Sequence, residues 1–127
     1  FSAADVDAFV DYFRNRDREA VILCGMETHV CVYQTALGLL EEGLDVFVPA
    51  DAVVSRRSQS WQRGLDLLRE AGAIIGSTET FCFQLLGRSD VPEFKELSPY
   101  LKDPEAAWDE APAPDAEPTQ SPAESAR

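Results

Sequence analysis

Cys31 is the residue of this sequence that is best placed for covalent chemistry. An apolar run at Ala20–Cys24 precedes it, Gly25 interrupts that run, and from Cys31 onward the chain has helical spacing and good helix formers. At such a strand–loop–helix junction the first backbone N–H groups of the helix are unpaired, and the helix dipole favours negative charge. These conditions favour the thiolate form of a cysteine, which is the nucleophilic form. We therefore predict that Cys31 is a covalent nucleophile.

The other two cysteines fit a structural role better. A free cysteine more often fills space in a core than reacts, and the residues alone leave that alternative open for Cys31. Cys24 lies inside the predicted strand, and Cys82 lies on the apolar face of a later predicted helix. We expect both Cys24 and Cys82 to be buried.

His29 is the only histidine, and a Cys31–His29 dyad is an alternative mechanism. Residues two apart in the first turn of a helix point to different sides, so we favour a surface or substrate-lining position for His29. Thr28 and Arg56 are further candidates for lining the substrate site. Arg56 follows a predicted strand at the sheet end where α/β proteins bind ligands, but we favour a structural position for it, in solvent or paired with Asp51.

Apolar runs and helical patterns alternate along the chain. Three strand–helix units in series predict an α/β fold with parallel strands and right-handed crossovers. The predicted strands are Ala20–Cys24, which should be buried on both faces, Asp45–Val48, which should also be buried, and the short Ala73–Ile75. The predicted helices cover residues 1–18, 31–40, about 60–71, 78–86 and 92–102. The pattern of the fourth helix predicts that Phe81, Cys82 and Leu85 are buried, and Ser77 or Thr78 should cap it.

The globular part is predicted to end near Lys102, which gives a domain at residues 1–102 and a tail at residues 103–127. The tail holds five of the eight prolines and carries a net charge of −6, half of the chain's −12. Such a composition cannot bury enough apolar surface to fold. We expect a disordered acidic tail.

Charge and hydropathy limit the partners of the chain. A net charge of −12 argues against nucleic acid or an anionic membrane, because both are bound by basic patches. No apolar run approaches the roughly 18 residues of a membrane span, and no signal peptide is evident. Three cysteines without a disulfide pattern fit a reducing compartment. We therefore expect a cytoplasmic protein whose partners are neither nucleic acid nor a membrane.

A longer motif surrounds Cys31. The run LCGMETHVCVYQTALGLLEEGLDVFVPADAVVSR (residues 23–56) contains C-G-x-x-T-x-x-C-V, then G-x-x-V-x-V, then D-A-x-x-S-R. It resembles the core of the isochorismatase-like cysteine hydrolases, and AGAIIGSTE and PEFKELSPYLK resemble later parts of the same domain. The resemblance implies a three-layer, Rossmann-like parallel sheet with helices on both faces, of which this chain would hold the C-terminal half.

The resemblance also implies a catalytic site. In that family the site has an aspartate base, a lysine and the cysteine, and only Cys31 matches here, because the other two would lie upstream of Phe1. The backbone N–H groups of Glu27 and Cys31 match the oxyanion-hole donors, with a cis peptide bond expected between Met26 and Glu27. Zinc-dependent relatives use an aspartate and two histidines, so with one histidine we expect no metal and no other cofactor.

These observations favour a hydrolase that cleaves a C–N amide or ester bond of a small molecule through a thioester on Cys31. We expect the chain by itself to be inactive, because the two partner residues are missing, and we expect a homo-oligomer. One alternative is a binding protein or pseudoenzyme that keeps the cysteine without turnover. Another is a structural fragment that needs its missing half.

Overall fold

The computed structural model describes residues 1–15 and 18–102. The chain forms two compact units, Phe1–Gly87 and a second one that begins at Arg88. The first unit holds η1 (Ala3–Asp5), α1 (Asp7–Arg14), β1 (Ala20–Ile22), β2 (Gly25–Met26), η2 (Thr28–Val32), α2 (Tyr33–Glu41), β3 (Asp45–Pro49), β4 (Val53–Val54), α3 (Ser58–Glu70), β5 (Ile74–Gly76) and α4 (Thr78–Leu86). The second unit holds α5 (Pro92–Lys102).

The central sheet has the strand order β1-β3-β5, and all of its strands are parallel. Val21 pairs with Val46, and Val48 pairs with Ile75. This confirms the predicted α/β fold with parallel strands. A second parallel pair joins β2 to β4 beyond the end of β1, so Gly25, which was expected only to end a strand, begins another one.

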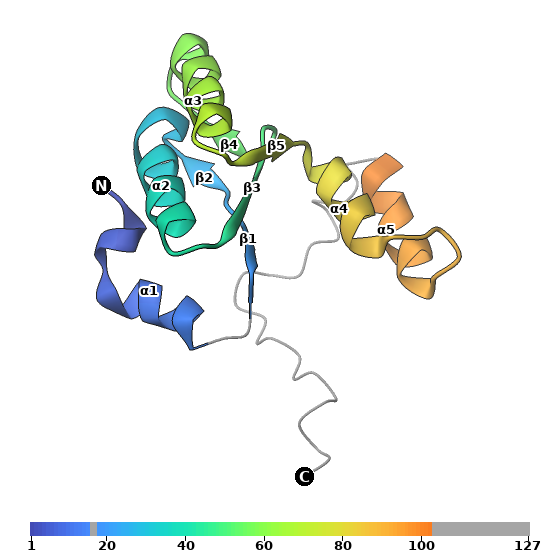
Figure 1. Ribbon diagram of the computed structural model, residues 1–127. Coiled ribbons are helices and arrows are strands. Elements are labelled where there is room, and N and C mark those ends of the chain that lie inside the picture. Colours follow the sequence, from blue (N-terminus) through green and yellow to red (C-terminus); the bar gives the residue numbers. More distant parts are fainter. Residues whose placement is uncertain (16–17, 103–127) are drawn as a thin grey trace, which may run out of the picture. The chain divides into compact units, whose positions relative to one another are not determined.

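Helices cover both faces of the sheet, as predicted (Figure 1). On one face α1, α2 and α3 enclose the core, in which Leu39, Leu68, Val46 and Val48 are almost fully buried. Phe9 and Phe13 of α1 pack against this core. The single helix predicted over residues 1–18 is wrong: Ser2 caps η1 by accepting a hydrogen bond from the amide of Ala4 at 3.0 Å, and Val6 is extended between η1 and α1. On the other face α4 packs through the ring of Phe81 against that of Phe47, with ring centroids 5.4 Å apart.

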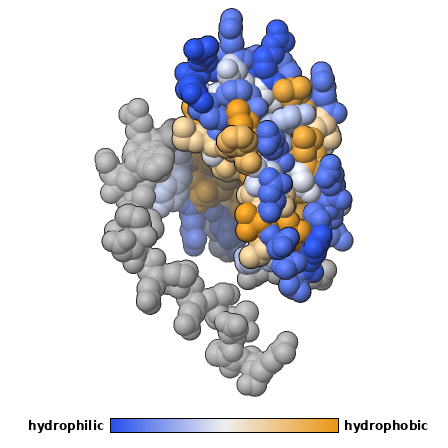
Figure 2. Space-filling model, turned by 90° about the vertical axis from the view of Figure 1, so that its left-hand side faces the viewer, coloured by the Kyte–Doolittle hydropathy of each residue, from blue (hydrophilic) through white to orange (hydrophobic). Residues whose placement is uncertain are grey.

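The face covered by α4 is the place where the prediction of a strand buried on both faces is wrong. Ala20 is exposed and Ile22 is 46% exposed. On α4 itself Phe81 is buried as predicted, but Cys82 is only partly buried and Leu85 is 77% exposed. Within Phe1–Gly87, β1 is an edge strand of the central sheet, and Ile22 and Leu85 border an open apolar pocket, so they are incompletely covered. Apolar patches also interrupt the hydrophilic surface on the face shown in Figure 2.

The start of α4 is fixed by two side chains. Ser77 caps it, as expected, by accepting the Thr80 amide at 3.1 Å. Asp51, which follows β3, accepts hydrogen bonds from the amide and the hydroxyl of Thr78 at 2.7 and 3.0 Å. Of the two structural positions expected for Arg56, the pairing with Asp51 is not formed, and the Asp51 carboxylate holds the N-terminus of α4.

In the second unit, α5 begins at Pro92, as the sequence predicts. Its stripe of Phe94, Leu97 and Leu101 is partly buried. The predicted tail at residues 103–127 lies outside the described residues. Among the helices described, none is long and apolar enough to cross a membrane.

Candidate active site

Cys31 lies inside a π-helical turn. The turn η2 runs from Thr28 to Val32 and continues directly into α2, so the helical segment begins three residues before Cys31 and not at Cys31 as predicted. The carbonyl oxygen of Glu27 accepts hydrogen bonds from the amides of Val30 and Val32, both at 3.1 Å. In an α-helix the amide of Cys31 would bond to this carbonyl. In the π-turn Val32 takes that place, and Cys31 remains in the first turn of a helical segment, where the dipole acts most strongly.

The chain reaches this turn through β2. Gly25 has a φ of 126°, a left-handed conformation that favours glycine, and its amide donates to the carbonyl of Ala52 at 3.0 Å. The peptide bond between Met26 and Glu27 is cis, which is the isomer that the resemblance implies at this position. Met26 also pairs with Val54 in the β2–β4 ladder. Pairing with β4 therefore fixes the backbone that leads into the π-turn.

The side chain of Glu27 turns toward the segment that follows β4. One carboxylate oxygen accepts the backbone amide of Arg56 at 3.2 Å, and the other lies 3.3 Å from the guanidinium Nε of Arg56. The Glu27 side chain is only 15% exposed, whereas that of Arg56 is 74% exposed. Arg56 thus has a structural partner, as favoured from the sequence, but the partner is Glu27.

His29 contacts the same segment. Its Nδ1 lies 3.0 Å from the hydroxyl of Ser55 and 3.6 Å from a carboxylate oxygen of Glu27. Among the hydrogen bonds of residues 1–15 and 18–102, none joins His29 to Cys31. The alternative of a Cys31–His29 dyad is therefore not formed in this structure.

Thr28 is fully buried, although it was a candidate for lining a substrate site. Its methyl group and backbone pack against Gly64 of α3, where an added Cβ would lie 2.8 Å from the His29 amide nitrogen and 2.9 Å from the Thr28 carbonyl carbon. Its hydroxyl finds no hydrogen-bond partner among the described residues. The structure therefore buries Thr28, the first residue of the π-turn, against α3.

The prediction that Cys24 is buried is wrong. β1 ends at Ile22, so Cys24 lies in the loop before β2 and is exposed, while Cys31 and Cys82 are partly buried. Partial desolvation of the sulfur, together with the negative charge of Asp51, raises the pKa of the Cys24 thiol. Exposure alone would make Cys24 the most accessible of the three thiols.

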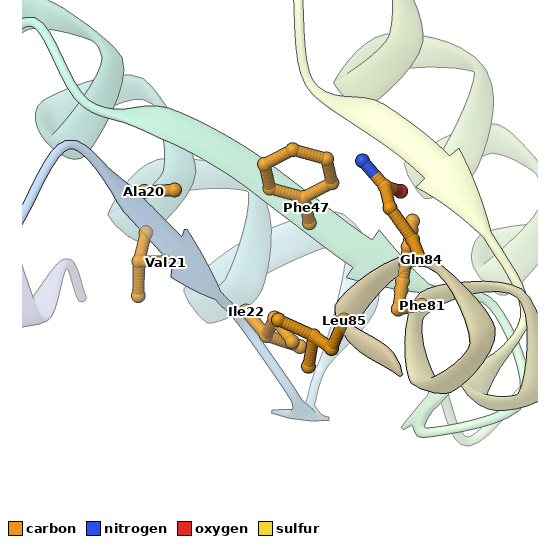
Figure 3. Close-up of a pocket in the computed structure, with 7 residues that line it drawn as sticks. All are labelled: Ala20, Val21, Ile22, Phe47, Phe81, Gln84 and Leu85. Carbon is orange, nitrogen blue, oxygen red and sulfur yellow. The ribbon is translucent and has the colours of Figure 1, made fainter. Parts of the chain in front are cut away.

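A pocket of about 400 Å³ opens on the α4 side of the sheet. Figure 3 shows Ile22 and Phe47 projecting from β1 and β3 toward α4. Its lining is apolar apart from one amide and consists of Ala20, Val21, Ile22, Phe47, Phe81, Gln84 and Leu85. None of the residues predicted for the site lines it, so the pocket and the Cys31 turn are separate features. Within the described part of the chain, no group of three or more His, Cys, Asp or Glu side chains could hold a metal ion.

The isochorismatase domain model matches residues 1–80, which include β1, the π-turn and the segment after β4. The chain belongs to the isochorismatase family. It is 48% identical over 86 residues to the secreted isochorismatase effector Isc1 of Phytophthora sojae, a match that covers 68% of this chain and 41% of that protein. It is 44% identical over 85 residues to isochorismatase domain-containing protein 2 of Bos taurus, a match that covers 67% of this chain and 42% of that protein.

A solved structure agrees with this assignment. The structure titled MAR1 ribonuclease from Caenorhabditis elegans has a TM-score of 0.73 and 34% identity, and the match covers 94% of this chain and 58% of that one. The chain therefore spans about two fifths of the length of the curated relatives that it matches. This isochorismatase-family chain holds the cysteine turn with its flanking strands.

Sequence reasoning missed the links from Glu27 to Arg56 and from His29 to Ser55. The signal for them was present, because Ser55 and Arg56 are the last two residues of the D-A-x-x-S-R motif. The motif did not show which residues they contact.

Proposed function

We propose that this chain supplies the nucleophile of a cysteine hydrolase that cleaves a C–N amide or ester bond of a small molecule. The observation that carries the proposal is the position of Cys31 in the first turn of a helical segment, inside the region matched by the family. A thiolate there is stabilised by the helix dipole.

The π-turn also supports the proposed oxyanion hole. Since the Glu27 carbonyl bonds to Val30 and Val32, it leaves the amide of Cys31 for another acceptor. The amide of Glu27, which follows the cis bond, is the second proposed donor. Backbone N–H groups that point at a developing oxyanion stabilise it more than the ground-state carbonyl.

The proposed reaction has two steps. The Cys31 thiolate attacks the substrate carbonyl carbon, the C–S bond forms and the carbonyl electrons move to oxygen; the C–N or C–O bond then breaks, and the amine or alcohol leaves with a proton. Water next attacks the thioester, releases the acid and returns the thiol. An amine needs a positioned proton donor to leave, and the aspartate and lysine that the resemblance implies have no match in this chain. We therefore propose that the complete site needs residues beyond those matched here.

The proposed substrate is small and is not a nucleic acid. The C. elegans relative is titled a ribonuclease, but a chain with a net charge of −12 repels a polyanion. Assembly into a homo-oligomer and a cytoplasmic location remain predictions.

An activated ester tests the nucleophile without requiring a proton donor, because p-nitrophenolate leaves unprotonated. We expect p-nitrophenyl acetate to release p-nitrophenolate in a single turnover and to leave an acetyl group on Cys31, which peptide mass spectrometry locates. Cys31→Ala should abolish both signals, and Cys24→Ala should leave both intact. Acetylation that spares Cys31, or equal acetylation of Cys24, would refute the proposal and favour a binding protein that lacks turnover.

A further inference from the structure

We infer that the carboxylate of Glu27, held by Arg56, positions the backbone amide of Glu27 as an oxyanion donor. The contact between His29 and Ser55 is a second link that holds the same turn in place. The inference rests on the proposed function and extends it, because it assigns positioning residues to the site. It also assigns a structural role to Ser55 and Arg56, the last two residues of the D-A-x-x-S-R motif.

The first support is the way in which Arg56 holds both oxygens of one carboxylate. The backbone amide of Arg56 donates to one oxygen at 3.2 Å, and the guanidinium Nε lies 3.3 Å from the other. Hydrogen bonds to a charged acceptor are stronger than those between neutral groups. Because the Glu27 side chain is only 15% exposed, water replaces these contacts poorly when they are lost.

The second support is that the contacts continue a backbone ladder. Gly25 pairs with Val53 and Met26 pairs with Val54, and the ladder then ends. Beyond the end of the ladder, side-chain contacts join the same two segments: Glu27 contacts Arg56, and His29 contacts the buried hydroxyl of Ser55 at 3.0 Å. The peptide group of Glu27 is therefore held before it by the ladder and after it by two side-chain links.

The third support is the position of Glu27 itself. It is the residue that precedes the first turn of η2, and its carbonyl accepts the amides of Val30 and Val32. A rotation of this residue would move its amide and the start of the π-turn together. Removal of the carboxylate should therefore weaken oxyanion stabilisation without removing the cysteine.

Two reagents separate this role from a general effect on the fold. Iodoacetamide reacts with a thiolate by displacement: the C–S bond forms, iodide leaves, and no oxyanion develops. p-Nitrophenyl acetate reacts with the same thiolate through a tetrahedral oxyanion. The ratio of the acylation rate to the alkylation rate at Cys31, both located by peptide mass spectrometry, therefore reports on the oxyanion donors.

We expect Glu27→Ala to lower this ratio by about tenfold or more, since loss of a whole oxyanion donor costs about 10²–10³-fold. Glu27→Gln keeps an acceptor and should lower the ratio less. Alkylation alone should stay within about threefold of the unchanged chain. Arg56→Ala removes only the guanidinium contact and keeps the backbone hydrogen bond, so it should act in the same direction with a smaller effect. The double variant Glu27→Ala/Arg56→Ala should add little to Glu27→Ala, because without the carboxylate the guanidinium has no partner here to lose.

The matched control is Glu42→Ala, which breaks the Arg14–Glu42 ion pair at 2.7 Å, at the opposite end of α2 from this turn, and should leave the ratio unchanged. An unchanged ratio in Glu27→Ala and in Arg56→Ala overturns the inference, as does a fall that Glu42→Ala reproduces. Should Glu27→Ala fail to fold by circular dichroism, Arg56→Ala at its exposed position decides alone. The unchanged chain is assayed first. If it is not acylated at Cys31, the proposed function fails. If it is acylated but the variants leave the ratio of acylation to alkylation unchanged, only the positioning role is refuted.

Discussion

Cys24 lies just before β2 and Cys31 lies in the π-turn that follows β2, and the surroundings of the two thiols differ. Cys24 is exposed, but partial desolvation and the charge of Asp51 raise the pKa of its thiol above the ordinary value of 9.0. A raised pKa means a smaller thiolate fraction at neutral pH. Exposure and ionisation therefore act in opposite directions on the reactivity of Cys24.

We predict that alkylation of Cys24 increases only at alkaline pH, and that Asp51→Asn moves this rise to lower pH. The substitution removes a negative charge that disfavours the thiolate, while its amide oxygen can still accept the hydrogen bonds of Thr78. Timed iodoacetamide labelling of Cys24 at a series of pH values measures the shift. A rise that stays in place or moves to higher pH in Asp51→Asn would contradict the prediction.

Single-residue predictions succeeded where they depended on neighbours in the sequence. Ser77 caps a helix as its local pattern indicates, and Cys31 lies in a first helical turn. The partner of Arg56 could not be predicted in this way, because Asp51 is close in sequence whereas Glu27 becomes close only when β2 pairs with β4. Local spacing does not encode such a contact.

At the scale of elements, the π-turn is the feature that helical spacing did not reveal. The apolar pattern predicts a helix from Cys31, but the helical backbone starts at Thr28. α3 packs against this turn at Gly64, which allows the close approach of the two backbones. The shape of the turn therefore depends on a residue in another helix.

Gly64→Ala should destabilise the chain by about 1–3 kcal/mol, which is the usual cost of overpacking a filled site. The new methyl group would lie 2.8 Å from the backbone nitrogen of His29, and neither backbone can move freely. Thermal unfolding should show a melting temperature lower by about 4–8 °C for each kcal/mol in a domain of this size.

Gln62→Ala provides the control for this prediction. Gln62 is an exposed position of the same helix, so the substitution changes helix propensity without filling a contact. Its melting temperature should stay close to that of the unchanged chain. A Gly64→Ala variant as stable as Gln62→Ala would show that α3 and the π-turn can separate without cost.

At the scale of the whole molecule, the fold class and the parallel strand order follow from the alternating pattern, but the burial of the strands does not. An apolar run such as Ala20–Cys24 indicates that a strand is suited to a buried sheet. The run does not indicate which elements cover that strand. Within Phe1–Gly87, Ile22 and Leu85 border the pocket between β1 and α4 and remain exposed.

This exposed edge should make the isolated chain associate. Edge strands with unpaired backbone groups and adjacent apolar patches favour association. We predict that Ile22→Lys reduces self-association in sedimentation velocity. Ile74→Lys is the matched control, because Ile74 is 47% exposed compared with 46% for Ile22 but does not line the pocket beside Leu85. Equal effects of the two changes would contradict a role for the β1 side.

Turnover of amides should require more chain than is present here. We predict no measurable amidase activity for this chain, and activity for a version extended upstream through the aspartate and lysine that the family resemblance implies. Loss of a positioned proton donor typically lowers a rate by about 10²–10⁴-fold. A panel of simple amides, with Cys31→Ala in the longer version as control, provides the assay. Turnover by the short chain that disappears in its own Cys31→Ala variant would contradict this prediction.

The most direct measurement of the central claim compares the three thiols of one chain. In a timed reaction with iodoacetamide at neutral pH, followed by peptide mass spectrometry, we predict that Cys31 is alkylated about tenfold or more faster than Cys24 and Cys82. Cys31 is partly buried and Cys24 is exposed, so accessibility alone predicts the opposite order. Equal labelling of the three cysteines, or faster labelling of Cys24 or Cys82, would contradict the assignment of Cys31 as the nucleophile.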